Sequence, residues 1–356
     1  MNKLTIGHLQ LETPVVQAAL SGYSDWPMRT IARRLGASYS VHEVMIETFV
    51  NQLKDRERTR RFLQVTDEDH PVGAQLMGSD PDEFASAAIR LVNAGFDVID
   101  INFGCPMKRL RGQCRGGLML GQPETALRIV ESVRAAVPDR IPVTVKMRRG
   151  LDDSSESRDR FFQILEGAVR AGIAAATIHG RTVEQKYIGP SRWEFLREVR
   201  AAFPELTMLG SGDLFTAADC VRMLRETGVN GVTAARGSIG NPWIFREACA
   251  LLRGEPLPEP PSVREQREVI LEHLSLAESV YDGDLASRQL RKFGIRYAEL
   301  HPQFESVRNA FIGVTCREQL IHVIEALYST DLPGRRISAS EGEMQSEDCC
   351  SQPKIC

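Results

Sequence analysis

The sequence predicts an α/β protein, a TIM (β/α)8 barrel followed by a small all-helical C-terminal domain. Apolar strand-like runs alternate with longer amphipathic stretches about eight times along the first ~250 residues, the pattern of eight strand–helix units. Several of the runs are apolar on both faces, as parallel strands covered by helices should be. A doubly wound sheet is the structural alternative, but the glycine-rich turn that follows its first strand is missing.

Each barrel strand is predicted from a run rich in Val, Ile, Leu and Ala. The predicted strands are residues 14–20, 38–43, 71–76, 97–102, 142–147, 174–179, 206–211 and 230–235. Residues 80–94 and 123–137 have the spacing of amphipathic helices, and Asp80 is a predicted N-cap with Pro81 at the first helical position. Residues 1–8 lack the apolar core of a signal peptide and predict a first strand.

Two breaks in the pattern divide the chain into three predicted parts. Residues 254–261 contain four prolines and cannot form a regular helix, so they predict a linker. The barrel then spans residues 1–253, and residues 254–331 form the helical domain, which has no strand pattern. Residues 332–356 are polar and rich in Ser and Glu, and we expect a disordered tail there.

The composition is typical of an ordinary soluble globular protein. Hydrophobic residues make up 42% of the chain and charged residues 26%. No apolar run approaches the ~20 residues that a membrane-spanning helix needs. The eight cysteines include no CxxC pair and no zinc-ligand spacing, so we expect reduced thiols, no metal and a cytoplasmic location. We also expect a monomer.

A basic stripe is predicted on the helical domain. The net charge of −3 gives the whole chain no attraction to nucleic acid, so an RNA contact needs a local cluster of cations. Arg288, Lys292 and Arg296 are spaced to lie on one helix face. Such a stripe suits a phosphate backbone better than a small substrate, although each residue alone is typical of a solvated face.

The most informative motif follows the fourth predicted strand. The run Asn102-Phe103-Gly104-Cys105-Pro106 places a thiol at a strand's carboxyl end, where TIM barrels build their active sites. Four cations follow within ten residues, namely Lys108, Arg109, Arg111 and Arg115. A thiol can donate a proton and cations can hold phosphates, so this pairing suggests acid catalysis on a nucleic acid. The alternatives are an inert, buried Cys105, or Cys114 as the donor.

Other predicted strands also end in polar or ionisable residues, and this regularity favours an enzyme. Two glycine-containing loops, residues 210–213 and 235–238, follow the seventh and eighth strands, where TIM barrels commonly hold a phosphate, although ordinary turns are the alternative. Lys146 ends a very apolar strand and would need an electron-rich partner such as a reduced flavin. The remaining polar strand ends are Glu43, Gln75, and His179 with Arg181.

Taken together, these motifs resemble the dihydrouridine synthase family, flavin enzymes that reduce uridine in RNA. The resemblance covers about residues 12–330. The motifs that carry it are SGYSDWPMR at 21–29, QLMGSDP at 75–81, DINFGCP at 100–106, PVTVKMR at 142–148, HGRT at 179–182, GSGD at 210–213, Ala235-Arg236-Gly237, and GNPWIF at 240–245.

The resemblance implies an FMN-containing barrel in which hydride passes from NADPH through FMN to C6 of uracil while Cys105 protonates C5. It implies an RNA substrate, with tRNA as the default, whose target base is extruded into the barrel. By motif matching, the cofactor-binding residues are Ala18, Ala19, Leu20, Gln75, Lys146, His179, Ser211, Gly212, Asp213, Ala235 and Arg236. The implied substrate-binding residues are Asn102, which should help to hold the uracil, Lys108, Arg148 and Arg181.

Three positions depart from the family pattern, and all touch the expected FMN site. The first strand ends Ala18-Ala19-Leu20 in place of Ala-Pro-Met, Ser211 stands in place of Asn, and Ala235 in place of Gly. Because backbone groups make most contacts to a phosphate, we expect FMN to be retained.

Three other functions stay open from the sequence. The chain could act on ribosomal RNA, it could be a flavin oxidoreductase for a free small molecule, or it could be an RNA-binding protein without a flavin. The helical domain with its basic stripe argues against the small-molecule function. The presence of Asn102, Cys105, Lys146 and His179 argues against the loss of catalysis.

Overall fold

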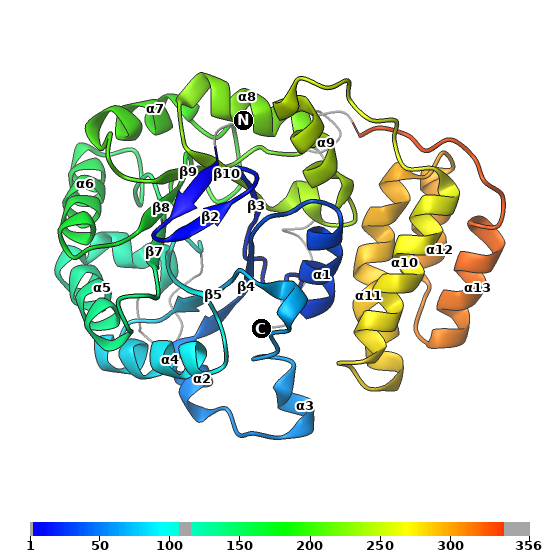
Figure 1. Cartoon of the computed structure of the whole chain (residues 1–356), viewed down its shortest axis with the longest axis horizontal. Helices are drawn as coiled ribbons and strands as arrows, with labels where there is room; N and C mark the ends of the chain where they lie inside the picture. The colour runs from blue at the N-terminus through cyan, green and yellow to red at the C-terminus, as the bar shows by residue number, and fades with distance from the viewer. Residues whose placement is uncertain (1–2, 107–114, 338–356) are drawn as a thin grey trace.

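The computed structural model describes residues 3–106 and 115–337, and their central feature is a closed barrel of eight parallel strands (Figure 1). The strands neighbour one another in the order β10-β3-β4-β5-β6-β7-β8-β9. Their bounds are β3 (Val15–Gln17), β4 (Ser40–Ile46), β5 (Val72–Met77), β6 (Val98–Phe103), β7 (Val143–Arg148), β8 (Ala175–His179), β9 (Met208–Ser211) and β10 (Gly231–Ala234). Each overlaps the run that predicts it, so the predicted TIM barrel is confirmed.

The parallel register sets inward-facing side chains in level rows near the carboxyl rim of the barrel. Gln75, Asp100 and Thr144 are Cα partners across β5, β6 and β7. Two residues further along β6, Asn102 is the partner of Lys146. The ladder therefore brings two amides, a carboxyl and an ammonium group from three strands to neighbouring positions.

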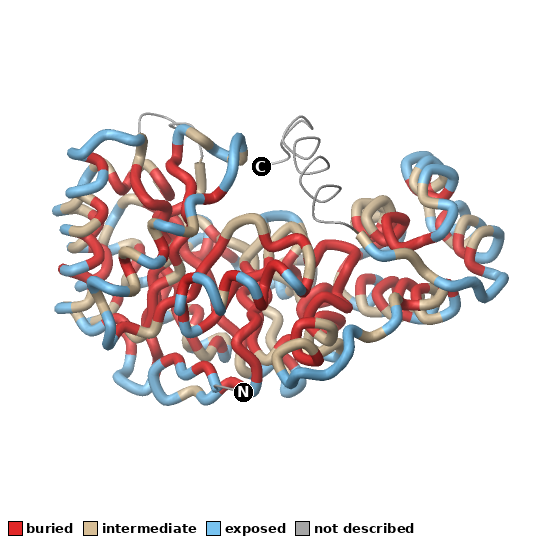
Figure 2. The backbone as a smooth tube through the Cα atoms, turned by 90° about the horizontal axis from the view of Figure 1, so that it is seen from above, coloured by how far each residue is buried: buried red, intermediate tan, exposed pale blue. Residues whose placement is uncertain are grey.

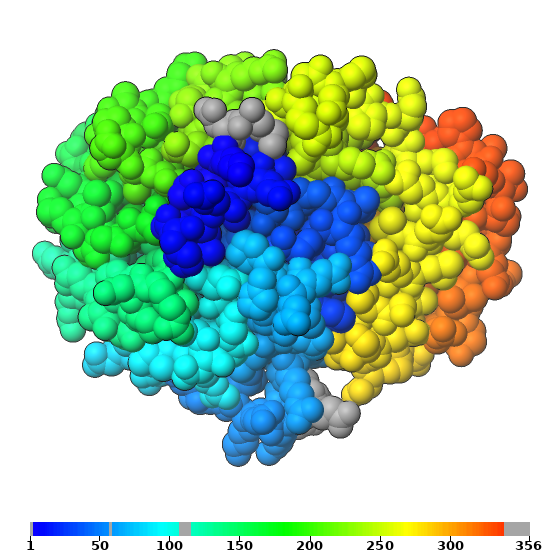
Figure 3. All heavy atoms as spheres, viewed as in Figure 1, coloured from blue at the N-terminus to red at the C-terminus, as the bar shows by residue number. Residues whose placement is uncertain are grey.

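A hairpin outside the barrel covers its amino-terminal end. Strands β1 (Leu4–Ile6) and β2 (Leu9–Leu11) pair antiparallel, and Leu4, Ile6 and Leu11 are buried against residues of the barrel strands. A Cβ on Gly231 would lie 2.8 Å from the Leu4 side chain, so the two surfaces fit closely. Figures 1 and 3 show the hairpin lying across the barrel. The strand predicted within residues 1–8 exists, and it belongs to this plug.

Helices surround the barrel and cover the outer face of its strands, except a short helix at residues 57–60 that projects from the barrel (Figure 1). They are α1 (Trp26–Arg34), α2 (Glu47–Gln52), α3 (Glu57–Arg60), α4 (Pro81–Asn93), α5 (Pro123–Ala136), α6 (Ser155–Arg170), α7 (Trp193–Ala202), α8 (Ala217–Thr227) and α9 (Trp243–Arg253), with 3-10 turns at Asp67–Asp69, Gly116–Gly121 and Arg236–Ser238. Helix α4 begins as predicted, because the Asp80 carboxylate accepts hydrogen bonds from the N–H groups of Asp82 and Glu83. In Figure 2 the buried backbone lies inside this ring and the exposed backbone on its rim.

The C-terminal domain is helical, as predicted, and shares a core with the barrel. It contains α10 (Val263–Glu278), α11 (Gly283–Tyr297), a 3-10 turn at Ala298–Leu300, α12 (Phe304–Ile312) and α13 (Arg317–Leu327). Met28 and Ile31 of α1 and Trp243 of α9 belong to the same apolar cluster as the inner faces of these helices. Residues 255–261 contain no helix or strand. The domain is therefore fixed against two barrel helices by apolar contact.

Two of the three residues of the predicted basic stripe make polar contacts within the protein. Arg288 is exposed, but the Lys292 ammonium group donates to the carbonyl of Gly22 in the barrel at 2.7 Å. Arg296 is mostly buried and pairs with Glu299 at 2.7 Å. Prediction of a continuous solvent-facing stripe was therefore wrong, because the helix face that carries it is turned partly toward the barrel.

The segment after α13 returns to the domain boundary. The N–H of Val263 donates to the carbonyl of Leu332 and the N–H of Arg335 to that of Leu300, both at 2.9 Å. Residues 332–337 therefore lie along the start of the helical domain, and residues 338–356, the rest of the predicted tail, lie outside the described residues.

Candidate active site

A cavity opens at the carboxyl rim of the barrel, and nearly all the predicted site residues line it. Its volume, counted out to the open mouth, is about 880 Å³. The predicted residues in its wall are Ala18, Ala19, Leu20, Gln75, Asn102, Cys105, Lys146, Arg148, His179, Ser211, Gly212, Asp213, Ala235 and Arg236. Lys108 and Cys114 lie outside the described residues.

The loop that carries Cys105 is held by hydrogen bonds to its main chain. Asn102 Oδ1 accepts from the N–H groups of Gly104 at 2.8 Å and Cys105 at 2.9 Å. The Cys105 carbonyl accepts from the N–H of Gly117 at 2.9 Å. A Cβ on Gly116, whose φ is +56°, would lie 3.1 Å from the Cβ of Cys105. Glycine there thus allows a close approach that fixes the half-buried thiol at the cavity wall.

Behind this loop a chain of side-chain hydrogen bonds crosses three strands. Asn102 Nδ2 donates to Gln75 Oε1 at 2.6 Å, and Gln75 Nε2 donates to Asp100 Oδ2 at 2.6 Å. The Thr144 hydroxyl donates to Asp100 Oδ1 at 2.5 Å. Burial raises the pKa of Asp100, and the two hydrogen bonds and the charge of Lys146 oppose that rise. The amide of Asn102, predicted to help hold the uracil, thus has both of its ends occupied within the protein.

Two cations lie beside Cys105 in the cavity wall. Burial, together with the neighbouring charge of Arg148, lowers the pKa of Lys146 to about 8. Burial also lowers the pKa of Arg148 to about 10. The Arg148 guanidinium donates to the carbonyl of Gly104 at 2.7 Å, and to those of Thr182 and Lys186. Arg148 therefore ties the Cys105 loop to the loop after β8.

His179 lies at the end of β8 in the cavity wall. Burial, followed by the charges of Arg148 and Lys146, holds its pKa well below the ordinary value. Arg181, predicted to face the substrate, lies behind the cavity wall. Its guanidinium pairs with Asp213 at 2.7 Å and donates to the carbonyl of Gly189. It joins the loops after β8 and β9.

The loops after β9 and β10 have the features of a phosphate site. Asp213 has φ +59°, and Ala235 has an uncommon backbone conformation with ψ −102°. The main-chain N–H groups of these two residues have no hydrogen-bond acceptor within residues 3–106 and 115–337. The Arg236 guanidinium lies beside them, 4.7 Å from the ring centre of Tyr187 and 5.2 Å from that of Phe215. Two free N–H donors and a guanidinium fit a phosphate group.

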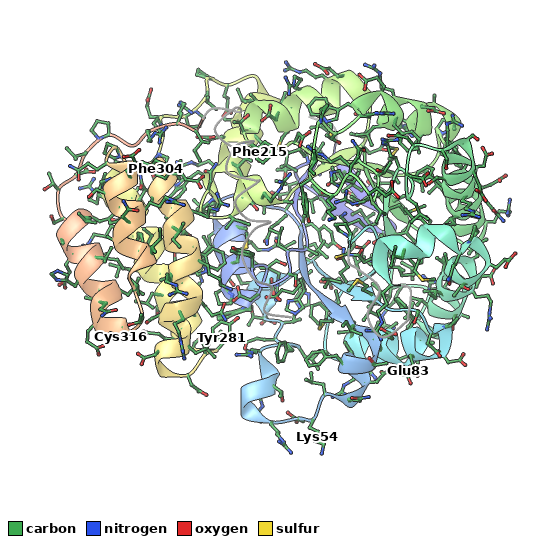
Figure 4. The ribbon with its side chains drawn as sticks, turned by 180° about the vertical axis from the view of Figure 1, so that it is seen from behind. Lys54, Glu83, Phe215, Tyr281, Phe304 and Cys316 are labelled. Atoms are coloured by element: carbon green, nitrogen blue, oxygen red, sulfur yellow. The ribbon has the colours of Figure 1, made fainter. Side chains whose placement is uncertain are left out.

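The cavity also contains residues that the strand-end argument did not find. They are Ser21, Val44, Gly104, Pro106, Tyr187, Leu214, Phe215 and Thr233. Tyr187 follows His179 by eight positions, so only the length of that loop, with its neighbouring cation Lys186, could have pointed to it. Phe215, labelled in Figure 4, comes from the loop that follows β9. An aromatic residue in a loop gives no signal of the direction in which it faces.

Comparison with known proteins shows the family of the chain. The model of the dihydrouridine synthase family matches residues 16–329. This chain belongs to that family. The probable tRNA-dihydrouridine synthase of Rhodobacter capsulatus is 34% identical to it over 83% of this chain and 89% of that protein. The tRNA-dihydrouridine synthase B of Xanthomonas axonopodis pv. citri is 33% identical over 86% and 90%, and the probable enzyme of Mycobacterium tuberculosis is 29% identical over 99% and 95%.

Solved structures with a similar barrel are far more distant in sequence. Morphinone reductase in complex with tetrahydroNAD has a TM-score of 0.52 at 15% identity, over 72% of this chain and 91% of that one. An old yellow enzyme homologue from Zymomonas mobilis has a TM-score of 0.52 at 16% identity, over 72% and 93%. At this identity the likeness shows the fold alone, whereas the family rests on the closer relatives.

No helix within residues 3–106 and 115–337 is long and apolar enough to cross a membrane. In the same ranges no three His, Cys, Asp or Glu side chains are grouped so that they could hold a metal ion.

Proposed function

We propose that this protein reduces uridine to dihydrouridine in tRNA, with FMN as its cofactor, NADPH as the reductant and Cys105 as the proton donor. The observation that carries the proposal is the thiol held at the cavity wall, beside Lys146 and Arg148. Its family membership and the tRNA-dihydrouridine synthases among its relatives support the same reaction. We expect the protein to work in the cytoplasm, where its substrate is processed.

The residues of the cavity fit FMN at both ends of the cofactor. The Asp213 and Ala235 N–H groups with the Arg236 guanidinium would hold the phosphate. Lys146, partly open to the cavity, would lie against the electron-rich ring. When bound, FMN supplies the hydride that adds to C6 of uracil. The departures at Ala18-Ala19-Leu20, Ser211 and Ala235 leave this arrangement possible, since the phosphate donors are main-chain groups.

Cys105 completes the reduction by delivering a proton to C5 of the uracil. An ordinary cysteine thiol has a pKa near ~8.5, so it carries its proton at neutral pH. As the S–H bond breaks and the C5–H bond forms, the sulfur becomes a thiolate. The charges of Lys146 and Arg148 interact favourably with a thiolate at this position. Both cations thus stabilise the product state of the proton transfer.

The substrate must leave its RNA stack to reach the thiol. A barrel mouth admits a single nucleotide, so the target uridine would be extruded, at a cost of a few kcal/mol. The net charge of −3 means that local cations must provide the attraction to RNA. Arg288 on the exposed side of α11 is one such cation. A free small molecule would have no use for the helical domain, which argues against that alternative.

Nucleoside mass spectrometry on tRNA and ribosomal RNA, purified separately from cells with and without this gene, tests the proposal. Loss of dihydrouridine from tRNA alone is the expected result. Loss from ribosomal RNA alone would replace the substrate, and no loss from either, in cells without a redundant enzyme, would overturn the proposal. The visible spectrum of the purified protein tests the cofactor, because bound FMN gives a yellow protein with a defined absorbance.

A further inference from the structure

The hydrogen-bond chain behind Cys105 is anchored at both ends by groups that cannot reverse their roles. At the outer end, two main-chain N–H groups, those of Gly104 and Cys105, can only donate. At the inner end, Asp100 Oδ2 accepts from Gln75. The two amides between them, Gln75 and Asn102, each have one donor end and one acceptor end.

Only one orientation of both amides satisfies the two anchors. Because Asn102 Oδ1 accepts from the loop, its Nδ2 faces Gln75 and must find an acceptor, which is Gln75 Oε1. Gln75 Nε2 is then directed at Asp100. If both amides were reversed, the Asn102 NH2 group would face the two main-chain donors, and the loop would lose both bonds.

We propose that Asp100 is a positioning residue for the reaction: by accepting from Gln75 it fixes the orientation of both amides and thereby holds the Cys105 loop on Asn102. Asp100 is buried and does not line the active-site cavity. Thr144 occupies the other carboxyl oxygen, which leaves Oδ2 for Gln75. This inference rests on the proposed role of Cys105 as proton donor.

The identity of the residue at position 100 decides whether the reversed state is available. A carboxylate offers only acceptors to Gln75, so it stabilises one orientation. An asparagine side chain has the same shape, but it can direct its NH2 group at Gln75 Oε1. It then provides the donor that the reversed chain needs at its inner end. Asp100→Asn is therefore expected to loosen the Cys105 loop without creating a cavity.

A pair of substitutions can rebuild the chain with its polarity reversed. In Asn102→Asp the new carboxylate still accepts from Gly104 and Cys105, but it competes with Asp100 for the single NH2 group of Gln75. In the double variant Asp100→Asn/Asn102→Asp, Gln75 donates to position 102 and accepts from the NH2 group of position 100. The Thr144 hydroxyl can then donate to the amide oxygen at position 100. Every group has a partner again.

The test is peptide-resolved amide hydrogen exchange at residues 103–105, together with melting temperatures, on the purified full chain without RNA. For Asp100→Asn we expect exchange at Gly104 and Cys105 to rise by about five- to tenfold, because a neutral amide oxygen accepts from Gln75 more weakly than a carboxylate and no longer excludes the reversed chain. The double variant should return to within about threefold of wild type, and its melting temperature should exceed the value that the two single variants predict by addition. Thr144→Val, which keeps the Asp100–Gln75 bond, is the matched control and should stay within about threefold.

Two results would overturn the inference: wild-type exchange in Asp100→Asn, or a double variant with no more protection than the single one and additive melting temperatures. If Asp100→Asn does not fold, the melting temperatures of the other two variants still test the inference. A rescue would give the double variant a higher melting temperature than Asn102→Asp. Uridine reduction by the same proteins gives a separate readout. A wild-type protein that makes no dihydrouridine would refute the proposed function and leave the exchange result standing.

Discussion

Two buried carboxyl groups of this protein, Asp100 and Asp25, are held in different ways. Burial raises the pKa of both. Asp100 takes its partners from adjacent barrel strands, where the register fixes them. Asp25 caps α1 by accepting from the N–H of Met28, and it also accepts from the hydroxyl of Tyr281 at 2.6 Å. Tyr281, labelled in Figure 4, belongs to the helical domain.

The difference shows which part of the active site depends on domain docking. The cluster around Asp25 includes Glu43, whose carboxylate accepts from the N–H of Gly22 at 2.9 Å, and Lys292, which donates to the Gly22 carbonyl. Residues adjoining Gly22, Leu20 and Ser21, line the cavity. Among the described residues, the hydrogen bonds that hold the Cys105 loop come from the barrel strands and their loops, whereas the loop at residues 20–24 is also held by the helical domain.

The largest expected effect comes from the barrel side. For Cys105→Ala we expect uridine reduction to fall about 10²–10⁴-fold, because the proton donor is lost. FMN binding and its reduction by NADPH should survive, since the phosphate-binding loops are untouched. Stopped-flow absorbance of the flavin separates the two half-reactions.

Cys316→Ala, in the helical domain, is the control for that experiment and should leave both half-reactions unchanged. A Cys105→Ala protein that makes dihydrouridine at the wild-type rate would remove Cys105 as the acid, and Cys114 would become the candidate.

The next effect tests the domain boundary. Tyr281→Phe removes the hydroxyl donor of Asp25, and we expect the free energy of unfolding to fall by about 1–3 kcal/mol. The affinity for FMN should also fall, by a smaller factor than the folding equilibrium, because the loop at residues 20–24 is held less firmly. Urea unfolding followed by fluorescence measures the first quantity and flavin titration the second. Unchanged stability would mean that the Tyr281–Asp25 hydrogen bond contributes nothing to holding the domain.

The boundary cluster also predicts a pH dependence. Burial, with the nearby Asp25 charge, raises the pKa of Glu43 from its ordinary 4.5 to about 7. A raised carboxyl pKa favours folding while the group is neutral, so this contribution is present below about pH 4.5 and is lost as the pH rises to about 7. We expect Glu43→Gln to gain stability relative to wild type between pH 5 and 8, by roughly 1–3 kcal/mol.

Unfolding curves of both proteins across that pH range check the expectation. Glu305→Gln, on the helical domain, is the control. Asp97→Gln cannot serve, because the Asp97 carboxylate accepts a hydrogen bond from the N–H of Val72. Two parallel curves for Glu43→Gln and wild type would contradict the assignment.

The smallest effect concerns the exposed cation of α11. Arg288→Ala should change the free energy of unfolding by no more than about 0.5 kcal/mol, because the side chain is exposed. Its affinity for tRNA should fall about two- to fivefold at low salt and less at high salt. Filter binding at two salt concentrations measures this. No change at low salt would remove α11 from the RNA-binding surface.

The barrel and the position of its site were predictable because both follow from local patterns. Apolar runs locate each strand, and the carboxyl end of a parallel strand is a site in any TIM barrel. Asn102, Cys105, Lys146 and Arg236 are single residues at such ends, so their convergence at one rim needed no knowledge of side-chain orientation.

Features that depend on pairing across the fold were not predictable in the same way. The chain through Gln75, Asp100 and Thr144 requires the register of three strands, which no single run contains. Lys292 has a helical spacing that suggests a solvated face, and only the docking of the domain turns it to Gly22. Arg181 follows the end of β8 by two residues, close to the predicted site residues, yet Asp213 holds it behind the cavity wall.

The hairpin at the barrel floor has a consequence for how the chain acquires its fold. Leu4 sits against Gly231 of β10, the last barrel strand, so the first and last parts of the barrel sequence meet in one contact. Such a separation gives the floor a high contact order, which slows folding. During synthesis on the ribosome, Leu4 cannot form this contact until more than two hundred further residues have emerged. Removing residues 1–11 would therefore expose apolar core residues at this end of the barrel, and would not merely shorten a flexible end.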